Sequence, residues 1–289
     1  MTEIVLLDGG MSRELMRLGA PFCQPEWSAL ALIESPDHVR RAHRSFAAAG
    51  AQVLTTNAYA VVPFHLGAEP FERRGRHLAE LAARLAREAA DEAGVRVAGC
   101  LPPPLGSYRP DVVDDAESAR ILQVLIDAQA PFADVWLIET RSSIAEAELA
   151  ASIVADHGDI PLWIAYTVDD VDGATLRSGE SVVDAVRAAE RVGAGVVAFN
   201  CSSPAAVEHA LRTARPATDL TMGAYANALV DVADGAANED IAAVDLDLTP
   251  TAFVGWAERW IDAGARLVGG CCGIDARHLA ALSAHLSAG

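Results

Sequence analysis

The hydrophobic pattern alternates short apolar runs with longer amphipathic stretches along the whole chain. The short runs are rich in β-branched and apolar residues and predict eight strands, at 4–7, 52–56, 95–101, 134–138, 162–166, 195–199, 220–224 and 265–268. The longer stretches are dense in Ala, Leu, Glu and Arg with helical spacing, as at 36–49, 71–93, 181–192 and 251–263. Each of these four is followed by a glycine, which is typical of a helix C-terminus.

Strands that alternate with helices predict a parallel sheet, because each strand reaches its neighbour through a right-handed crossover. Eight such units in 289 residues favour a closed (β/α)8 barrel, or TIM barrel, over an open doubly wound sheet. The open sheet stays an alternative, although the turn Asp8-Gly9-Gly10-Met11-Ser12 lacks the glycine-rich dinucleotide fingerprint. No linker interrupts the rhythm, so we expect a single barrel domain over residues 1–289.

Two predicted connections are much longer than a strand-to-helix turn requires. They run from Pro102 to Asp115 and from Ala226 to Leu248. Long loops inside compact domains are often lids or binding loops. Both follow strands, so we expect both at the C-terminal face of the barrel.

Composition and charge narrow the class of protein. The chain is 52% hydrophobic and 21% charged, which is enough apolar residue to build a large core. A net charge of -18 without a basic cluster argues against a nucleic-acid partner. No uncharged apolar run is long enough to cross a bilayer and no signal peptide opens the chain, so we expect no membrane partner. Five cysteines, an odd number, favour a reducing compartment, and the cytoplasm is the expected location.

Polar and reactive residues follow several of the predicted strands. In a (β/α)8 barrel the C-terminal strand ends form the active-site face, so these side chains should meet at one mouth. The residues concerned are Asp8, Thr56, Asn57, Glu139, Thr140, Asn200, Cys201, Cys271 and Cys272. For Asp8 and Glu139 there is a purely structural alternative, in which each carboxylate caps or braces the loop or helix that follows it by hydrogen bonding.

Three of the cysteines form a candidate zinc site. Cys201 follows the sixth strand, and Cys271 and Cys272 follow the eighth. Three protein ligands leave one coordination position open, as catalytic zinc sites do. The alternative is that each of these three cysteines is simply a small buried residue with no metal-binding role. Cys100 is expected inside the barrel and Cys23 in a loop, and either would close the site if it supplied a fourth thiolate.

Two other classes of function remain open on the residues alone. A zinc hydrolase would need a metal-bound water and a general base, but the eight histidines contain no His-Glu-x-x-His arrangement. A non-catalytic zinc or thiol-redox protein could use the adjacent Cys271 and Cys272 as a redox pair. Nothing in the sequence indicates the oligomeric state.

Seven segments together resemble the homocysteine S-methyltransferase family, from one end of the chain to the other. They are Asp8-Gly9-Gly10-Met11, Glu26-Trp27-Ser28-Ala29-Leu30, His43 with Ala49-Gly50-Ala51, Thr55-Thr56-Asn57-Ala58-Tyr59, Ile138-Glu139-Thr140, Phe199-Asn200-Cys201 and Gly269-Gly270-Cys271-Cys272-Gly273. The last two are the specific ones. The resemblance implies a zinc enzyme on a (β/α)8 barrel that transfers a methyl group to the thiol of homocysteine and gives methionine.

Carried over position by position, the resemblance implies a ligand set and a substrate site. Cys201, Cys271 and Cys272 would bind one Zn²⁺ per chain, with the substrate sulfur in the open place. Asp8 and Glu139 would hold the amino group of homocysteine. The full set of implied substrate-binding residues is Asp8, Gly9, Gly10, Thr56, Asn57, Glu139 and Asn200. Thr56 and Asn57 would line the pocket or merely tie the loop.

The methyl donor is the least determined part of the reaction. The segment around Trp27 is closer to family members that use S-methylmethionine or S-adenosylmethionine, so a sulfonium donor is expected. Betaine, a folate or another donor, or a different thiol acceptor, is the alternative. Trp27, Tyr59 or Phe64 would offer an aromatic face to a cationic donor. Two segments depart from the family pattern, at 101–110 and 225–229, and both are expected near the donor.

Overall fold

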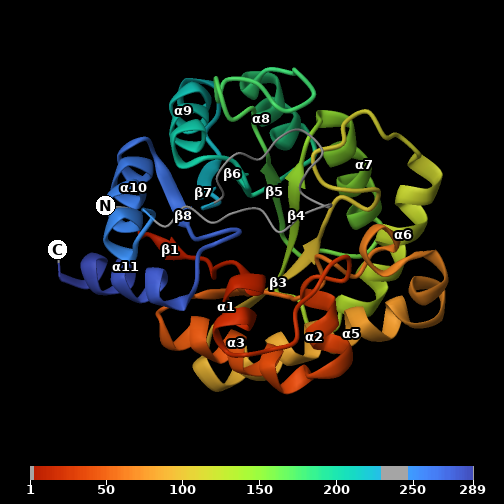
Figure 1. Ribbon diagram of the computed structural model, residues 1–289. Coiled ribbons are helices and arrows are strands. Elements are labelled where there is room, and N and C mark those ends of the chain that lie inside the picture. Colours follow the sequence, from red (N-terminus) through yellow and green to blue (C-terminus); the bar gives the residue numbers. More distant parts are fainter. Residues whose placement is uncertain (1–2, 229–246, 289) are drawn as a thin grey trace.

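In the computed structural model, a ring of eight strands is surrounded by helices (Figure 1). The structure describes residues 3–228 and 247–288. The strands are β1 Val5–Leu6, β2 Val53–Thr55, β3 Arg96–Leu101, β4 Val135–Arg141, β5 Leu162–Tyr166, β6 Val196–Asn200, β7 Thr221–Tyr225 and β8 Ala265–Val268. The helices are α1 Met11–Arg17, α2 Ser28–Glu34, α3 Pro36–Ala48, α4 Pro63–Leu66, α5 Ala68–Ala93, α6 Asp115–Gln129, α7 Ile144–Ala155, α8 Val182–Arg191, α9 Pro204–Ala214, α10 Pro250–Asp262 and α11 Ala276–Ala288, with a 3₁₀ turn at Arg215–Ala217.

All strand pairs are parallel and follow the order of the chain. Neighbours pair from β2 through to β8, and β8 pairs with β1. A parallel bridge between Leu7 and Val53 joins the β1 and β2 segments and closes the ring. The predicted (β/α)8 barrel is therefore confirmed, and the open doubly wound sheet was the wrong alternative.

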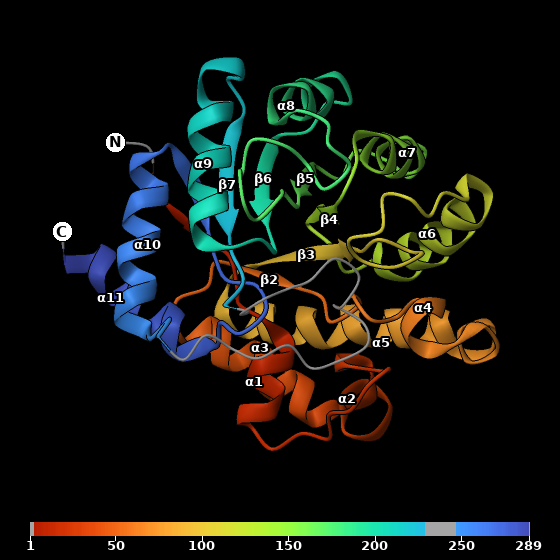
Figure 2. The ribbon, with the colours of Figure 1, turned by 45° about the horizontal axis from the view of Figure 1, so that its top comes forward.

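The first connection carries two helices beyond the usual crossover. Between β1 and β2 the chain forms α1, α2 and α3. Both α1 and α2 pack on α3, and α2 also packs on α5. The turned view in Figure 2 shows this group, in red and orange, on one side of the barrel. Trp27 immediately precedes α2 and carries a positive φ of 50°. The extra helices thus bring an aromatic side chain to the barrel mouth.

Side-chain oxygens cap several of the helices at their first turn, as the sequence chemistry demands. Ser143 and Glu146 form a reciprocal capping box at α7, and Asp114 caps α6. α5 ends at Gly94 in the left-handed conformation, as its glycine stop predicts. Local signals of this kind account for the agreement between predicted and observed helix ends.

Two kinds of core hold the barrel together. Inward-facing strand residues fill the interior, among them Val53, Ala98, Leu137, Ala165 and Leu267. The outward-facing strand residues pack against the helices in a larger apolar layer. A barrel filled in this way is a solid core and not a pore. Polar side chains inside the barrel are therefore expected only beyond this apolar filling, toward the C-terminal ends of the strands.

Two predicted boundaries were wrong in a way that matters for chemistry. Glu139 and Thr140 lie within β4 and not after it, and Asn200 is the last residue of β6. The pairing of β4 with β5 shifts between Ile138 and Arg141, and Thr140 has a φ of 59°. A bulge of this kind lengthens the strand and re-aims its side chains.

The long predicted loops are only partly described. The segment 102–114 connects β3 to α6 at the barrel mouth, as expected. The second loop falls mostly at 229–246, outside the described residues. Among the residues that the structure does describe, no helix combines the length and the apolar character needed to span a bilayer.

Candidate active site

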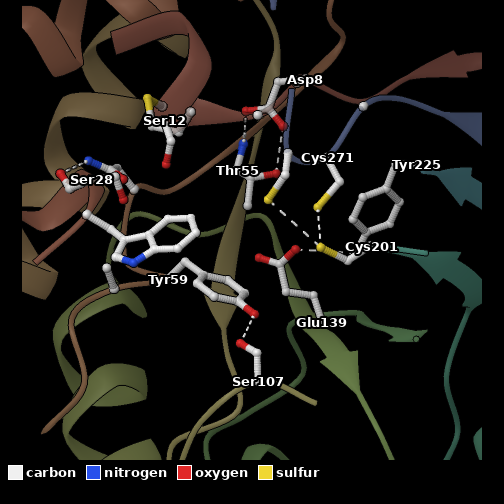
Figure 3. Close-up of a pocket in the computed structure, with 18 of the residues that line it drawn as sticks. Asp8, Ser12, Ser28, Thr55, Tyr59, Ser107, Glu139, Cys201, Tyr225 and Cys271 are labelled. Atoms are coloured by element: carbon white, nitrogen blue, oxygen red, sulfur yellow. Dashed lines mark hydrogen bonds between the residues drawn. The ribbon is translucent and has the colours of Figure 1, made fainter. Parts of the chain in front are cut away.

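A polar layer begins where the apolar filling of the barrel ends. Side chains alternate along a strand, so Thr55, Cys100 and Glu139 each follow an inward-facing residue by two positions. Thr55 and Glu139 line a pocket at the C-terminal face (Figure 3), and Cys100 is hydrogen-bonded to Glu139. Its wall comes from residues of six connections, among them Gly9, Gly10, Trp27, Tyr59, Tyr108, Cys201, Cys271 and Cys272.

Asp8 is the first buried carboxyl group of the pocket. Its Oδ2 accepts a hydrogen bond from the backbone N–H of Thr55 at 2.7 Å, and its Oδ1 accepts from the Thr55 hydroxyl at 2.8 Å. Only 3% of Asp8 is exposed. Burial raises the pKa of Asp8 to about 8, although both hydrogen bonds act in the opposite direction. Such a carboxyl group is prepared to ionise beside an incoming cation.

Glu139 is the second buried carboxyl group. The Cys100 thiol donates to its Oε1 at 2.9 Å, and the Tyr225 hydroxyl lies 3.5 Å from its Oε2. Burial raises the pKa of Glu139 to about 7, with the hydrogen bond from Cys100 acting against the shift. Within the described chain neither Asp8 nor Glu139 forms an ion pair. A ligand with a positive charge would supply the missing partner.

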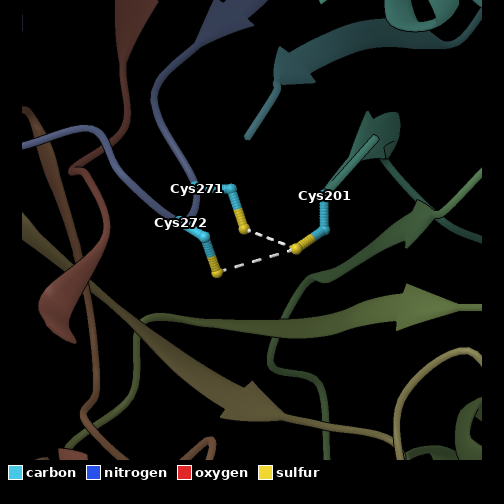
Figure 4. Close-up of side chains that lie close together, drawn as sticks. All are labelled: Cys201, Cys271 and Cys272. Carbon is cyan, nitrogen blue, oxygen red and sulfur yellow. Dashed lines mark hydrogen bonds between the residues drawn. The ribbon is translucent and has the colours of Figure 1, made fainter. Parts of the chain in front are cut away.

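Three cysteine sulfurs converge at one side of the pocket (Figure 4). Cys201 follows β6, and Cys271 and Cys272 lie in the loop after β8. The Sγ atom of Cys201 lies 3.0 Å from that of Cys271 and 4.0 Å from that of Cys272. Sulfur ligands of a tetrahedral zinc ion lie about 3.8 Å apart, given zinc–sulfur bonds of about 2.3 Å. The three thiols therefore fit a metal ion with small adjustments.

Hydrogen bonds among the three sulfurs shift their pKa values in opposite directions. The pKa of Cys271 is well above its ordinary value because its thiol donates to Cys201 and Cys272 and because it is buried. The pKa of Cys272 is well below its ordinary value because Cys201 and Cys271 donate hydrogen bonds to it. One sulfur thus carries the charge for the group. A divalent cation would remove the repulsion that prevents all three from ionising.

Close backbone packing fixes the loop that carries the adjacent cysteines. A Cβ atom at Gly10 would lie 2.3 Å from the carbonyl oxygen of Cys271, so only glycine fits there. The N–H of Ala228 donates to the Cys272 carbonyl at 2.7 Å, and the N–H of Cys271 donates to Ala226 at 3.0 Å. The departure from the family pattern after β7 therefore lies against the cysteine loop.

Aromatic side chains also line the pocket. The Tyr59 hydroxyl pairs with Ser107 at 2.6 Å, and the Tyr108 hydroxyl donates to the Cys201 sulfur at 2.9 Å. Burial, followed by the charge of Cys201, holds the pKa of Tyr108 well above its usual range, so its hydroxyl remains a donor. The Trp27 indole N–H is buried in the pocket and has no hydrogen-bond partner among the described residues.

Comparison with known proteins identifies the family of this chain. The sequence profile of the homocysteine S-methyltransferase family matches residues 5–286. The chain belongs to this family. The expected family and enzyme class, a methyltransferase, are thereby confirmed.

Individual members of the homocysteine S-methyltransferase family cover almost the whole chain. "Homocysteine S-methyltransferase 1" of Zea mays is 30% identical, over 92% of this chain and 89% of its own length. A relative from Astragalus bisulcatus named "Selenocysteine methyltransferase" is 25% identical, over 92% of this chain and 88% of its own. The metallated form of the homocysteine methyltransferase MmuM from Escherichia coli superposes with a TM-score of 0.81 at 27% identity, covering 98% and 96% of the two chains.

The remaining residues implied by the family resemblance are engaged with protein groups. The Thr56 hydroxyl donates to the Gln129 side chain at 2.5 Å, and the amide of Asn57 donates to the carbonyl of Ser28 at 3.1 Å. Asn200 is bound on both its side-chain atoms to Thr140, at 3.1 and 2.8 Å. Their assignment to substrate binding stays a prediction, although Thr56 and Asn57 line the pocket.

The other two cysteines lie where the sequence predicts, one inside the barrel and one in a loop. Cys100 is buried and bonded to Glu139, and Cys23 is exposed. Among the described residues the possible metal-binding group contains Cys201, Cys271 and Cys272 alone, so neither supplies a fourth thiolate. The pocket was incomplete in the sequence, because Thr55, Tyr108 and Tyr225 were not predicted as parts of it. Phe64, which was considered for the donor, is not among the lining residues.

Proposed function

We propose that this protein methylates the thiol of homocysteine, using a sulfonium compound, S-methylmethionine or S-adenosylmethionine, as methyl donor. One observation carries the proposal. A group of three cysteine sulfurs and two buried carboxyl groups without cationic partners line the same pocket. This combination matches an acceptor that carries both a thiol and an ammonium group. Family membership and the names of the relatives support it.

The cysteine group would hold one Zn²⁺ through Cys201, Cys271 and Cys272. A free thiol with a pKa near 8.5 is only about 3% ionised at pH 7, and zinc bound there would supply the charge that keeps the acceptor sulfur a thiolate. Sulfur-only ligation also disfavours the hydrolase alternative, which would need histidine or carboxylate ligands. The pocket contains one histidine, His65, and its Nδ1 is 3.1 Å from the carbonyl of Pro25.

Asp8 and Glu139 would bind the acceptor through its ammonium group. Both carboxyl groups are buried and their pKa values are raised, so an ammonium ion stabilises their ionised forms and gains an ion pair in return. Thr55 keeps Asp8 oriented through two hydrogen bonds, and Cys100 does the same for Glu139. The acceptor is then positioned by fixed groups, which favours attack from one direction.

The transfer itself balances without a further reactant. A lone pair on the acceptor sulfur forms the new sulfur–carbon bond, and the donor's sulfur–methyl bond breaks with its electron pair remaining on the donor sulfur. A cationic sulfonium and an anionic thiolate become two neutral thioethers, and the acceptor's thiol proton goes to solvent. A pocket that excludes water favours such a loss of charge. Trp27 and Tyr59 line it and offer aromatic faces to the cationic donor.

A donor and acceptor panel tests the proposal. Zinc-loaded protein is incubated with homocysteine and, in turn, S-methylmethionine, S-adenosylmethionine, betaine and methyltetrahydrofolate, and methionine is measured. Methionine from a sulfonium donor alone is the expected result. Product from betaine or the folate alone would overturn the donor assignment and leave the acceptor assignment intact. Selenocysteine serves as the second acceptor, and its exclusive use would overturn the acceptor assignment.

A further inference from the structure

The hydroxyl group of Tyr108 makes two contacts with a single cysteine. It lies 2.9 Å from the Sγ atom of Cys201 and 3.0 Å from the carbonyl oxygen of the same residue. The hydroxyl has one proton for these two acceptors. The carbonyl also accepts from the Thr167 hydroxyl at 3.4 Å, so it does not depend on Tyr108 alone. Among the described residues, Tyr108 is the residue whose hydroxyl lies within hydrogen-bond distance of the Cys201 sulfur.

The Tyr108 ring is held from behind by a cation. The guanidinium carbon of Arg177 lies 4.2 Å from the ring centroid, within the range of a cation–π contact. Arg177 donates to the Thr167 hydroxyl at 3.0 Å and to Asp170 at 2.8 Å, and only 7% of its side chain is exposed. A buried cation fixed by two partners leaves the phenol ring little freedom to turn.

The loop that carries Tyr108 is also anchored on its other side. The Arg141 guanidinium donates to the carbonyls of Leu101 and Pro102, both at 3.0 Å, where this loop begins. Ser107, next to Tyr108, pairs with Tyr59. Tyr108 itself has a φ of 61°, in the left-handed region that disfavours residues with a side chain. Surrounding contacts must therefore compensate for this conformation, which is the pattern seen at functional positions.

We propose that Tyr108 is a positioning residue of the cysteine site, whose hydroxyl orients the Cys201 sulfur and donates a hydrogen bond to it when it serves as a metal ligand. This inference rests on the metal site of the proposed function. It assigns a role to the long connection after β3, whose departure from the family pattern the acceptor and donor assignments do not explain. Arg177 acts on the Cys201 sulfur only indirectly, because it holds the phenol ring of Tyr108 in place.

The physical basis is the charge on the sulfur. An ionised sulfur accepts a stronger hydrogen bond than a neutral thiol does, so the contact from Tyr108 favours the ligating form of Cys201. The hydrogen bond also lowers the energy of the sulfur lone pairs, so its removal should move the sulfur-to-metal charge-transfer band to longer wavelength. Partners of this kind typically change metal affinity 10- to 100-fold when they are removed. The effect should therefore be visible in metal binding as well as in turnover.

The test compares Tyr108→Phe with the unmodified full chain, each loaded with Co²⁺ as a spectroscopic replacement for zinc. Tyr59→Phe is the matched control, because it removes a phenol hydroxyl from the same pocket that is bonded to Ser107 and not to a cysteine. The readouts are the sulfur-to-cobalt charge-transfer band and the metal dissociation constant from competition with a chelator. Near-ultraviolet circular dichroism confirms that each variant is folded.

For Tyr108→Phe we expect the charge-transfer band to move to longer wavelength and the dissociation constant to rise about 10-fold or more. Tyr59→Phe removes one anchor of the loop at Ser107 but keeps the Tyr108 hydroxyl, so it should change both readouts much less than Tyr108→Phe does. Equal band positions and equal dissociation constants in Tyr108→Phe and the unmodified chain would overturn the role of Tyr108 while the proposed function stands. An unmodified chain that shows no thiolate-to-cobalt band would instead remove the metal site, and the inference with it.

Arg177→Met keeps the test decisive if Tyr108→Phe does not fold. This variant retains the hydroxyl group and removes the cation that fixes the ring. We expect a band shift in the same direction but smaller, with a weaker effect on metal affinity. In the absence of a folded Tyr108→Phe, a folded Arg177→Met with the band and the dissociation constant of the unmodified chain contradicts the proposal.

Discussion

The buried thiol of Cys100 donates to Oε1 of Glu139 at 2.9 Å, and Cys100 is not part of the candidate metal site formed by the other three buried or half-buried cysteines. The sequence indicates Cys100 only as a core residue, yet its thiol supports the carboxyl group of Glu139, which we propose binds the substrate. Tyr225 approaches the other carboxyl oxygen at 3.5 Å. Both donors orient Glu139 toward the pocket, and this relationship can be tested separately from the metal site.

Replacing Cys100 with Val should weaken acceptor binding, because Glu139 loses a hydrogen bond to its charged form. Such bonds contribute about 1.5–3 kcal/mol. A thiol is a weak donor, so we expect the lower end of this range, a rise in KM for homocysteine of about 10-fold with little change in kcat. Cys100→Ser retains a donor and should restore most of the affinity. Steady-state kinetics with homocysteine as the varied substrate decides the matter. Equal KM values for the Val and Ser variants would show that the thiol acts only by packing.

Glu139→Gln should affect acceptor binding and not metal binding. The change removes the negative charge that would pair with the ammonium group, and a rise in KM of about 10- to 100-fold follows from the same energy range. Zinc content, measured by atomic emission, should remain that of the unmodified chain. An unchanged KM for homocysteine would remove Glu139 from the substrate site. Asp8→Asn is the parallel variant across the pocket.

Each cysteine of the triad should be required for metal content. Cys201→Ser, Cys271→Ser and Cys272→Ser replace a soft sulfur ligand with an oxygen that zinc binds poorly in this setting. We expect less than one zinc per chain after dialysis and loss of most methyl transfer. Cys23→Ser is the matched control, because Cys23 is exposed and lies outside the metal-binding group. A full zinc content in any of the three triad variants contradicts the ligand set.

Binding of an amino acid should release protons from the pocket near neutral pH. Burial holds the pKa of Asp8 at about 8 and that of Glu139 at about 7, so both carboxyl groups are largely protonated at pH 6. An ammonium group lowers both pKa values and displaces protons, so affinity should rise as the pH rises from 6 to 8. Titration calorimetry of metal-free protein with methionine, in buffers of different ionisation enthalpy, measures the number released.

Asp8→Asn provides the check on that titration. Methionine carries the ammonium group but no thiol proton, so the protons released come from the protein. The variant has one carboxyl group fewer, and its proton release at pH 6 should fall by about one. Identical proton release from the variant and the unmodified chain would mean that the protons come from another group.

The sequence predicted the barrel well because the signals for its elements are local. Strands at 162–166 and 265–268 were predicted with their observed limits, and helix starts and stops depend on capping residues a few positions away. The cysteine triad was also predictable, because strand ends in a barrel meet at one face. That Cys201 and the Cys271–Cys272 pair lie close together follows from the barrel topology alone, so it can be predicted without knowing how the side chains pack.

The parts that the sequence did not predict depend on the phase of a strand or on a loop. Thr55 and Thr56 are chemically identical neighbours, and only the inward direction of Val53 makes Thr55 the partner of Asp8. The bulge in β4 placed Glu139 inside a strand, and no residue pattern marks it. Tyr108 reaches Cys201 across 93 positions of sequence from a loop without periodicity.

The described non-glycine residues with positive φ are Trp27, Tyr108, Thr140 and Cys201. Three of them line the pocket, and the fourth binds Asn200 beside it. Glycine would relieve backbone strain at each position but remove the side chain found there. Attempts to make this chain more thermostable should therefore leave these four positions unchanged and look for gains on the outer helices, where stability and activity do not compete.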